Sequence, residues 1–201
     1  MSLILPSSAR RLAARVLLLA TALGLCACRT AGLKPGETLP RTSNVEQKAA
    51  PALYAWNGES LTGGIAVTID LSEQKAVITR GGEVAGWTYV ASGKPGYGTR
   101  TGSFSISEKV VDKVSTSWGQ VVNSDGGVVV ADAKAGRDGG GRFVGAPMPF
   151  WMRFNGAIGM HAGPIPNPGS PASHGCVRLP PGMAEILFGL AEIGTPVRVV
   201  P

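Results

Sequence analysis

One short stretch of the chain, residues 160–179, contains the residue types that nucleophilic catalysis requires. It reads MHAGPIPNPGSPASHGCVRL and holds both histidines of the sequence, His161 and His174. It also holds Cys176, the only cysteine outside the first thirty residues. A nucleophilic thiol needs a base within hydrogen-bond reach and backbone N–H donors that face the oxyanion it creates. Gly175 suits the second need, because glycine lets amides and substrate approach closely without a side chain between them.

A histidine beside this thiol predicts a reactive cysteine. A free thiol has a pKa of about 8.5, and pairing with an imidazole can lower it to roughly 3.5–7.5. We therefore expect Cys176 to be a thiolate that forms an acyl-enzyme, which divides amide exchange into two easier steps. No ATP is needed, because the cleaved amide supplies the energy for the new one.

The amino-terminal end of the chain predicts export. Three arginines precede an apolar run at residues 16–27, which is too short to span a bilayer comfortably. Residues 25–28, LCAC, resemble the cleavage box of a bacterial lipoprotein. We expect residues 1–27 to be a signal peptide and Cys28 to be lipidated. Because Cys26 is unusual in this box, a cut nearby by an ordinary signal peptidase is the alternative.

Charge and cysteine usage agree with a place in the cell envelope. Removing residues 1–27 takes away three arginines and no acidic residue, so the net charge falls from +6 to +3. No cluster of basic residues interleaved with aromatics indicates nucleic-acid binding. Unpaired cysteines in exported proteins are normally lost or used, which favours a functional Cys176. Arg29 lies directly after Cys28 and favours sorting of the lipoprotein to the outer membrane. We expect the protein to be periplasmic and monomeric.

The chain then divides into a linker and one domain. Residues 29–52 have no aromatic residue and no apolar periodicity, so we expect residues 28–56 to form a flexible linker. As a coil, this segment reaches on the order of 25–30 Å. Tyr54 and Trp56 mark the first expected packing contacts. Residues 57–201 have room for a single core.

The domain is predicted to be mainly β. From residue 64 onward, apolar and polar residues alternate with period two, and turns at residues 72–74 and 81–82 divide this pattern into a β-meander. Asn155 and Gly156 form a strong hairpin signal, which puts His161 at the end of a strand. Further strands are expected at residues 104–107, 128–131, 150–154, 157–161 and 197–200.

One helix and one lid are expected beside these strands. Pro181 suits the first turn of a helix with an apolar stripe, and Gly194 ends this segment. Residues 132–149 are rich in glycine and predict a lid over the site, with a solvated loop as the alternative. Among the aromatic residues, Trp118 is expected in the core, whereas Tyr97 lies between two glycines and is expected to line a substrate groove.

The motifs of this sequence resemble those of a known family. Residues 173–178 read SHGCVR, and they follow GKPGYGT at residues 93–99 and TGSF at residues 101–104. Together with His161, this combination is similar to the bacterial L,D-transpeptidase catalytic domain, the YkuD domain, over residues 64–200. Arg100 stands where the family usually has proline. The resemblance implies a β-sandwich-like domain with a small helix, and an enzyme of peptidoglycan biosynthesis that carbapenems inhibit.

The resemblance also implies residue roles. Cys176 would attack the carbonyl that joins the third residue of a stem peptide to the terminal D-alanine, and D-alanine would leave. His161 would transfer the proton and would be oriented by the backbone carbonyl of Ala162. The amides of Gly175 and Cys176, with His174 close by, would form the oxyanion hole. The expected substrate contacts are Arg178, Ser173, Tyr97 and Met160.

Several alternatives stay open at this point. The acyl acceptor is a second stem peptide, which gives a 3→3 cross-link, or a protein lysine, a free D-amino acid, or water, which makes the enzyme an L,D-carboxypeptidase. His161, His174 and Cys176 are also acceptable zinc ligands, although we expect no metal and no cofactor. Sortases use His, Cys and Arg in this order, but with a much longer spacing. A non-catalytic lipoprotein that binds the cell wall is the remaining possibility.

Overall fold

The structure is a computed structural model, and it describes residues 51–136 and 140–201. The expected signal peptide, Cys28 and most of the expected linker lie outside the described residues. None of the helices in this part of the chain is long and apolar enough to cross a membrane. Its elements are, in chain order, β1 (Tyr54–Trp56), β2 (Ile65–Asp70), β3 (Lys75–Arg80), β4 (Glu83–Tyr89), β5 (Gly102–Ser105), β6 (Glu108–Val122), β7 (Val128–Lys134), β8 (Arg142–Asn155), β9 (Ile158–Ala162), β10 (Val177–Leu179), α1 (Pro181–Leu190) and β11 (Pro196–Val200).

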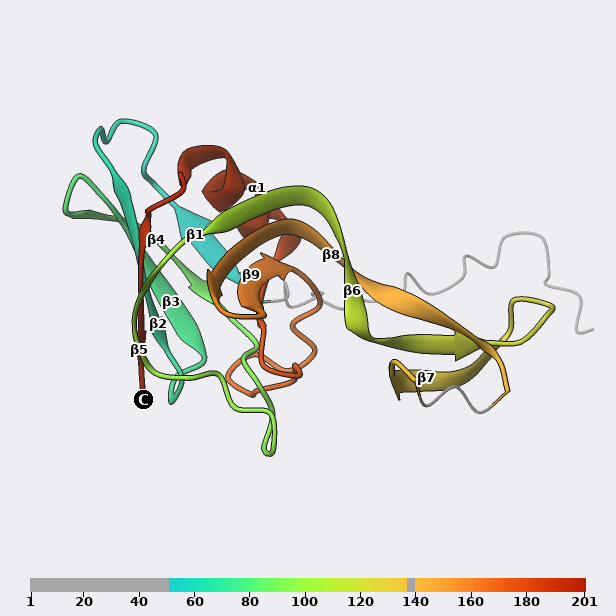
Figure 1. Ribbon diagram of the computed structural model, residues 1–201. Coiled ribbons are helices and arrows are strands. Elements are labelled where there is room, and N and C mark those ends of the chain that lie inside the picture. The colour runs from blue at the N-terminus through green and yellow to red at the C-terminus, as the bar shows by residue number, and fades with distance from the viewer. Residues whose placement is uncertain (1–50, 137–139) are drawn as a thin grey trace, which may run out of the picture. The chain divides into compact units, whose positions relative to one another are not determined.

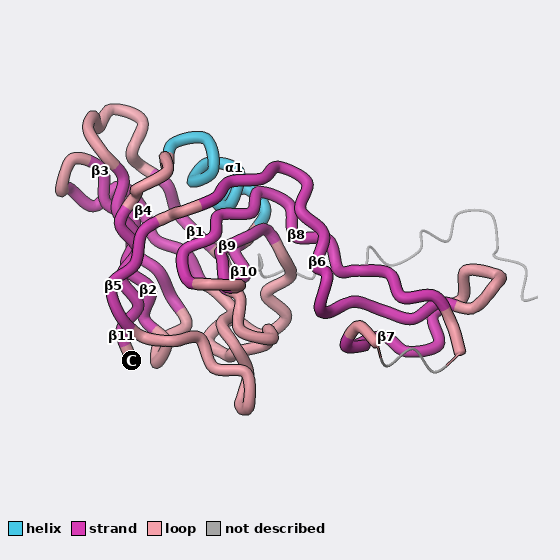
Figure 2. Tube along the Cα trace, viewed as in Figure 1, coloured by secondary structure: helices cyan, strands magenta, loops and turns pink. Residues whose placement is uncertain are grey.

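The strands form two sheets, so the predicted mainly β class is confirmed (Figures 1 and 2). The first sheet has the order β1-β4-β3-β2-β11-β5, and the second has the order β10-β9-β8-β6-β7. The predicted meander is β2, β3 and β4, which pair antiparallel. β1 pairs with β4, so the last three residues of the expected linker belong to the folded domain.

A single hydrophobic core joins the two sheets and the helix. In β2, the alternation of the sequence buries Ile65, Val67 and Ile69 on one face. The helix α1 contributes Met183 and Leu187, which are fully buried against the same cluster. The predicted helix is therefore confirmed. It begins at Pro181, a residue whose fixed φ suits the first helical turn.

The segment around residues 108–155 differs from the expectation. β6 and β8 run side by side along a long ribbon, and β7 pairs with the outer half of β6 (Figures 1 and 2). The expected loop at residues 132–149 is thus mostly strand on both sides of a turn. Many side chains of this ribbon are exposed, including Val111, Val114 and Val128. Since neither face is fully buried, the sequence shows no clean period-two pattern there.

Two strands at one edge of the second sheet, β9 and β10, hold the two ends of residues 160–179. β9 and β10 are parallel neighbours, and Arg178 lies directly opposite His161 in their register. Side chains at paired positions of neighbouring strands point to the same face of a sheet. His161 and Arg178 therefore share one face, while their neighbours Met160 and Val177 share the opposite face, in the core.

Candidate active site

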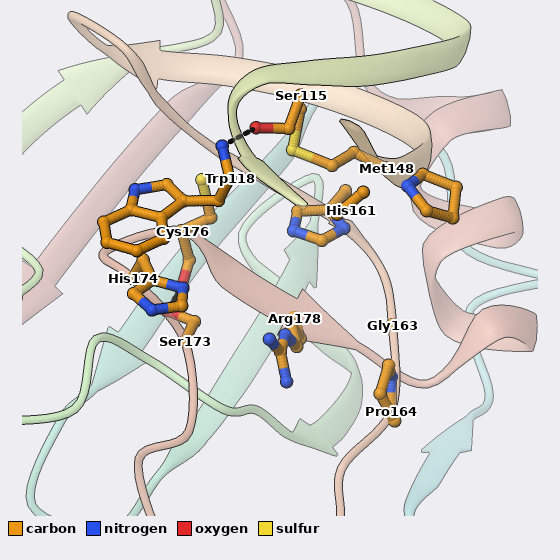
Figure 3. Close-up of a pocket in the computed structure, with 12 residues that line it drawn as sticks. Ser115, Trp118, Met148, His161, Gly163, Pro164, Ser173, His174, Cys176 and Arg178 are labelled. Carbon is orange, nitrogen blue, oxygen red and sulfur yellow. Dashed lines mark hydrogen bonds between the residues drawn. The ribbon is translucent and has the colours of Figure 1, made fainter. Parts of the chain in front are cut away.

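A cavity of about 290 Å³ brings together the thiol, both imidazoles and one guanidinium of the sequence motif (Figure 3). Cys176 lies just before β10, and His161 lies in β9 with only 6% of its surface exposed. Arg178 lines the same cavity. No hydrogen bond joins the Cys176 sulfur to the His161 ring in the described structure. Such contacts are often long without substrate and tighten in the reactive complex.

The His161 ring is held in one tautomer. Its Nδ1 lies 2.8 Å from the backbone carbonyl oxygen of Ala162, the contact that the resemblance implies. A carbonyl only accepts, so Nδ1 carries the proton and Nε2 keeps a free lone pair. The Trp151 ring packs against His161 at 6.1 Å between centroids, and its Nε1 donates to Glu108. Nε2 is therefore the nitrogen that can take a proton from the thiol.

The turn that carries Cys176 is closed by Ser173. The Ser173 hydroxyl donates to the backbone carbonyl of Cys176 and accepts the N–H of Gly175 at 3.0 Å. Ser173, which was expected to contact substrate, lines the cavity of the thiol, but it is almost fully buried and also braces the turn. The Gly175 amide, expected in the oxyanion hole, is thus already paired. The Cys176 amide has no acceptor within the described residues and is the donor left for an oxyanion.

The upstream glycine-rich segment holds this turn from behind. The Thr99 hydroxyl donates to the Gly175 carbonyl at 2.8 Å and accepts the N–H of Gly93 at 3.0 Å. Gly175 has a φ of +115°, which side chains rarely adopt. A Cβ at Gly93 would collide with the carbonyl oxygen of Tyr97, so only glycine fits there. The two motifs of the sequence are therefore halves of one turn assembly.

Replacing Thr99 by valine is expected to weaken this assembly. Thr99→Val keeps the shape but leaves the Gly93 N–H and the Gly175 carbonyl without a partner, and each unpaired buried group costs about 1–3 kcal/mol. We expect the free energy of unfolding to fall by about 2 kcal/mol in denaturant titrations. The control is Thr101→Val, an exposed neighbour. Equal stability of the two variants would contradict this role of Thr99.

His174 lines the cavity of Cys176 and His161 and also contacts the β6–β7 hairpin. Its ring stacks on Trp118 with 3.7 Å between centroids, as Figure 3 shows, and its Nε2 lies 3.3 Å from a carboxylate oxygen of Asp132. Asp132 also pairs with Lys94 at 3.1 Å. Trp118 was expected in the core, and no feature of the sequence placed it here. In the described part of the chain, no three His, Cys, Asp or Glu side chains converge on a possible metal position.

Two of the expected substrate contacts are wrong or displaced. Met160 has no exposed surface and belongs to the hydrophobic core, because alternation along β9 turns it away from the face of His161. Tyr97 is 39% exposed, but its ring packs edge-on against Trp118 and His174. It lines a neighbouring cavity with Lys94 and Asp132, which does not include Cys176. Arg178 and Ser173 are the expected contacts that do line the cavity of the thiol.

A second cavity, of about 380 Å³, reaches Cys176 from another side. Both cavities are lined by Ser115, Trp118 and Met148, so the β6–β8 ribbon covers the thiol between the two cavities. The expected lid segment does supply part of this cover, since Ala146, Pro147 and Met148 line the first cavity. They do so from strand β8 and not from a loop.

Comparison with known families identifies the domain. Residues 64–199 match the L,D-transpeptidase catalytic domain, YkuD. The chain belongs to this family. No relative was found among curated proteins.

Solved L,D-transpeptidases share the fold. The chain is similar to the L,D-transpeptidase of Stackebrandtia nassauensis, with 25% identity and a TM-score of 0.51 over 69% of this chain and 56% of that one. For the Mycobacterium smegmatis protein, the identity is 21%, the TM-score 0.55 and the coverage 69% and 59%. For the Enterococcus faecium protein, the identity is 27% and the TM-score 0.52, over 69% of this chain and 50% of that one. The chain thus spans little more than half the length of the first two.

In this L,D-transpeptidase domain, burial favours the neutral forms of Cys176 and His161. Burial raises the pKa of the Cys176 thiol above its usual value, while the Gly159 backbone N–H and the Arg178 charge oppose this effect. Burial also lowers the pKa of His161 to about 4. The expected resting thiolate is therefore not favoured, because both charged forms lose hydration. His161 instead stays ready to accept the thiol proton down to about pH 4.

The alkylation rate of Cys176 tests this neutral pair. Because the thiol pKa is raised, the thiolate fraction at neutral pH is small and grows as the pH increases. We expect the rate constant with iodoacetamide to rise about tenfold per pH unit from pH 6 to 9 without a plateau. Labelling of the Cys176→Ala variant gives the background from other cysteines. A plateau near pH 6 or 7 would instead reveal a thiolate–imidazolium pair.

Proposed function

We propose that this protein is a peptidoglycan L,D-transpeptidase that works through a thioester on Cys176. The observation that carries the proposal is the shared cavity of Cys176 and His161. Within the described residues, the free Nε2 of His161 and the unpaired amide of Cys176 are the two groups that acyl transfer needs there. Family membership and the solved L,D-transpeptidases support the same reaction class.

The first half-reaction forms the acyl-enzyme. His161 Nε2 takes the proton of the Cys176 thiol as the sulfur attacks the carbonyl before the terminal D-alanine. The Cys176 amide donates to the oxyanion, and one such donor is typically worth about 10²–10³ in rate. The carbon–nitrogen bond then breaks, and His161 returns the proton to the leaving amine. D-Alanine departs, and the stem peptide stays on the sulfur as a thioester.

The second half-reaction transfers the acyl group to an amine. The incoming amine attacks the thioester, His161 takes a proton from this amine, and the sulfur leaves and regains that proton. The product is a new amide, and the enzyme returns to its neutral state. Trp118, Met148 and Pro147 give the first cavity largely apolar walls, which limits the water that can compete with the amine. Hydrolysis by water, as in an L,D-carboxypeptidase, is the same chemistry with a different acceptor.

A tetrapeptide donor tests this function. We expect the wild-type protein to release D-alanine and to gain the mass of the acyl group, and Cys176→Ala to do neither. His161→Gln should slow D-alanine release by about 10²–10⁴ through loss of the general base. Avibactam is an independent probe, because a solved L,D-transpeptidase 28% identical to this chain forms a carbamoyl enzyme with it. D-Alanine release by folded Cys176→Ala would refute the proposal and favour a binding protein.

We further propose that the protein is an exported lipoprotein anchored through Cys28 on the periplasmic side. The three arginines, the apolar run at residues 16–27 and the LCAC box at residues 25–28 support this proposal. The residue after Cys28 is arginine, which supports outer-membrane sorting. The linker would then let the catalytic domain search the cell wall near the membrane.

Lipid labelling in cells tests the anchor. Cys28→Ser is expected to abolish incorporation of labelled palmitate and to release the protein from the membrane fraction, because the acylated thiol is gone. Cys26→Ser is the matched control, and it should keep the label since its position is removed with the signal peptide. Label that persists in Cys28→Ser would contradict the lipoprotein assignment.

A further inference from the structure

Arg178 is a cation without a counter-ion in the cavity of the thiol. None of the ion pairs within 4.0 Å in the described structure includes Arg178. Its charge nevertheless acts on the catalytic groups, since it shifts the pKa of His161, His174 and Cys176. A guanidinium stays charged at any physiological pH. The cavity therefore holds one fixed positive charge that a ligand can neutralise.

The fold fixes the backbone and the aliphatic stem of Arg178. The backbone of Arg178 exchanges two hydrogen bonds with Ala91, at 3.0 and 3.1 Å. Its aliphatic stem lies along Gly163, where an added Cβ would come within 3.1 Å of the Arg178 Cγ and Cδ. Figure 3 shows the side chain between Ser173 and Gly163, below Cys176 and His161. A pre-positioned guanidinium of this kind binds a carboxylate in bidentate geometry.

The position of His161 decides which part of the substrate meets Arg178. His161 gives its proton to the leaving amine and takes a proton from the incoming amine, and it has one free nitrogen for both steps. Both amines therefore use the same place, beside Nε2. His161 and Arg178 line the first cavity, whereas the second cavity includes Cys176 but not His161. The amines enter and leave through the first cavity, and the acyl chain occupies the second.

The second cavity has its own positive charges for the acyl chain. Lys113 and Arg153 line it, and Glu108 pairs with them at 3.9 and 2.8 Å. The Nε of Arg153 is buried and has no partner among the described residues. An acidic stem peptide suits this side. Arg178 is then left for a carboxylate that travels with the amine.

We infer that Arg178 binds the carboxylate adjacent to the reacting amine, first on the departing D-alanine and then on the acceptor. One guanidinium thus acts in both half-reactions, and it restricts acceptors to α-amino carboxylates. Free D-amino acids and the amine of diaminopimelate in a second stem peptide share this chemistry. A protein lysine lacks a carboxylate next to its amine and is excluded. This inference rests on the proposed transpeptidase function.

A comparison of two acceptors tests the inference on the wild-type full-length protein. D-Alanine and D-alaninamide carry the same amine, and only the first has a carboxylate. The amide has the less basic amine and so more free base at neutral pH, which favours it unless the carboxylate is recognised. The donor is a tetrapeptide that ends in unlabelled D-alanine, and both acceptors carry an isotope label, so that the product of transfer to D-alanine differs in mass from the donor. We expect kcat/KM for transfer to be at least about tenfold higher for D-alanine.

Variants assign this preference to Arg178. In Arg178→Gln, we expect the preference for D-alanine over its amide to fall to within about twofold, because the paired charge is gone. Arg153→Gln is the matched control, since it removes a cation from the second cavity and should weaken donor binding while the acceptor preference stays. If Arg178→Gln does not fold, Arg178→Lys is used in its place. The wild-type comparison of D-alanine with its amide still tests the inference.

The outcomes separate this inference from the function on which it rests. Equal use of D-alanine and its amide by the wild type, or an unchanged preference in folded Arg178→Gln, would overturn the role of Arg178 while leaving the transpeptidase intact. Absence of the thioester in the wild type would instead overturn the function. Incubation of the tetrapeptide with and without D-methionine distinguishes the two acceptor sources. A free D-amino acid gives an exchanged tetrapeptide, whereas a second stem peptide gives a cross-linked dimer. Transfer only to lysine side chains would also refute the inference.

Discussion

The hydrogen bonds that hold the left-handed turn at Gly175 are the constraint on which the site depends. Ser173 and Thr99 together occupy the amide and the carbonyl of this one glycine. Thr99 lies 76 residues upstream, so a tertiary contact fixes Cys176 in addition to the bonds that Ser173 makes within the loop. Because the amide and the carbonyl of Gly175 are both paired, the Cys176 amide is the donor that remains for a reacting carbonyl within the described residues. The same bonds that fix the thiol therefore also determine which donor serves the oxyanion.

Burial and charge have separate roles in the site. The surroundings of Cys176 and His161 disfavour ions, so the reaction begins from a neutral pair and charge develops only as bonds change. Arg178 supplies the one permanent charge on the side of the imidazole, at the paired position of the next strand. In the proposed mechanism, a neutral pair beside a fixed cation lets the site bind a carboxylate while the thiol stays protonated.

Much of this architecture could be predicted from the sequence where burial is one-sided. The meander, the helix at Pro181 and the place of His161 at a strand end all follow from period and turn signals. The same period would have put Met160 in the core, because it alternates with His161. Trp118 and Asp132 could not be found, since the β6–β8 ribbon is exposed on much of its surface and carries no pattern that indicates which residues return to the site.

Trp118 gives this protein a consequence beyond chemistry. Its indole lies face to face with the His174 imidazole and borders both cavities that reach the thiol. A protonated imidazole in such contact quenches excited indole, so the light that Trp118 emits depends on the charge of its neighbour and on what fills the space beside it. The domain therefore contains an intrinsic fluorophore that borders both cavities of the thiol.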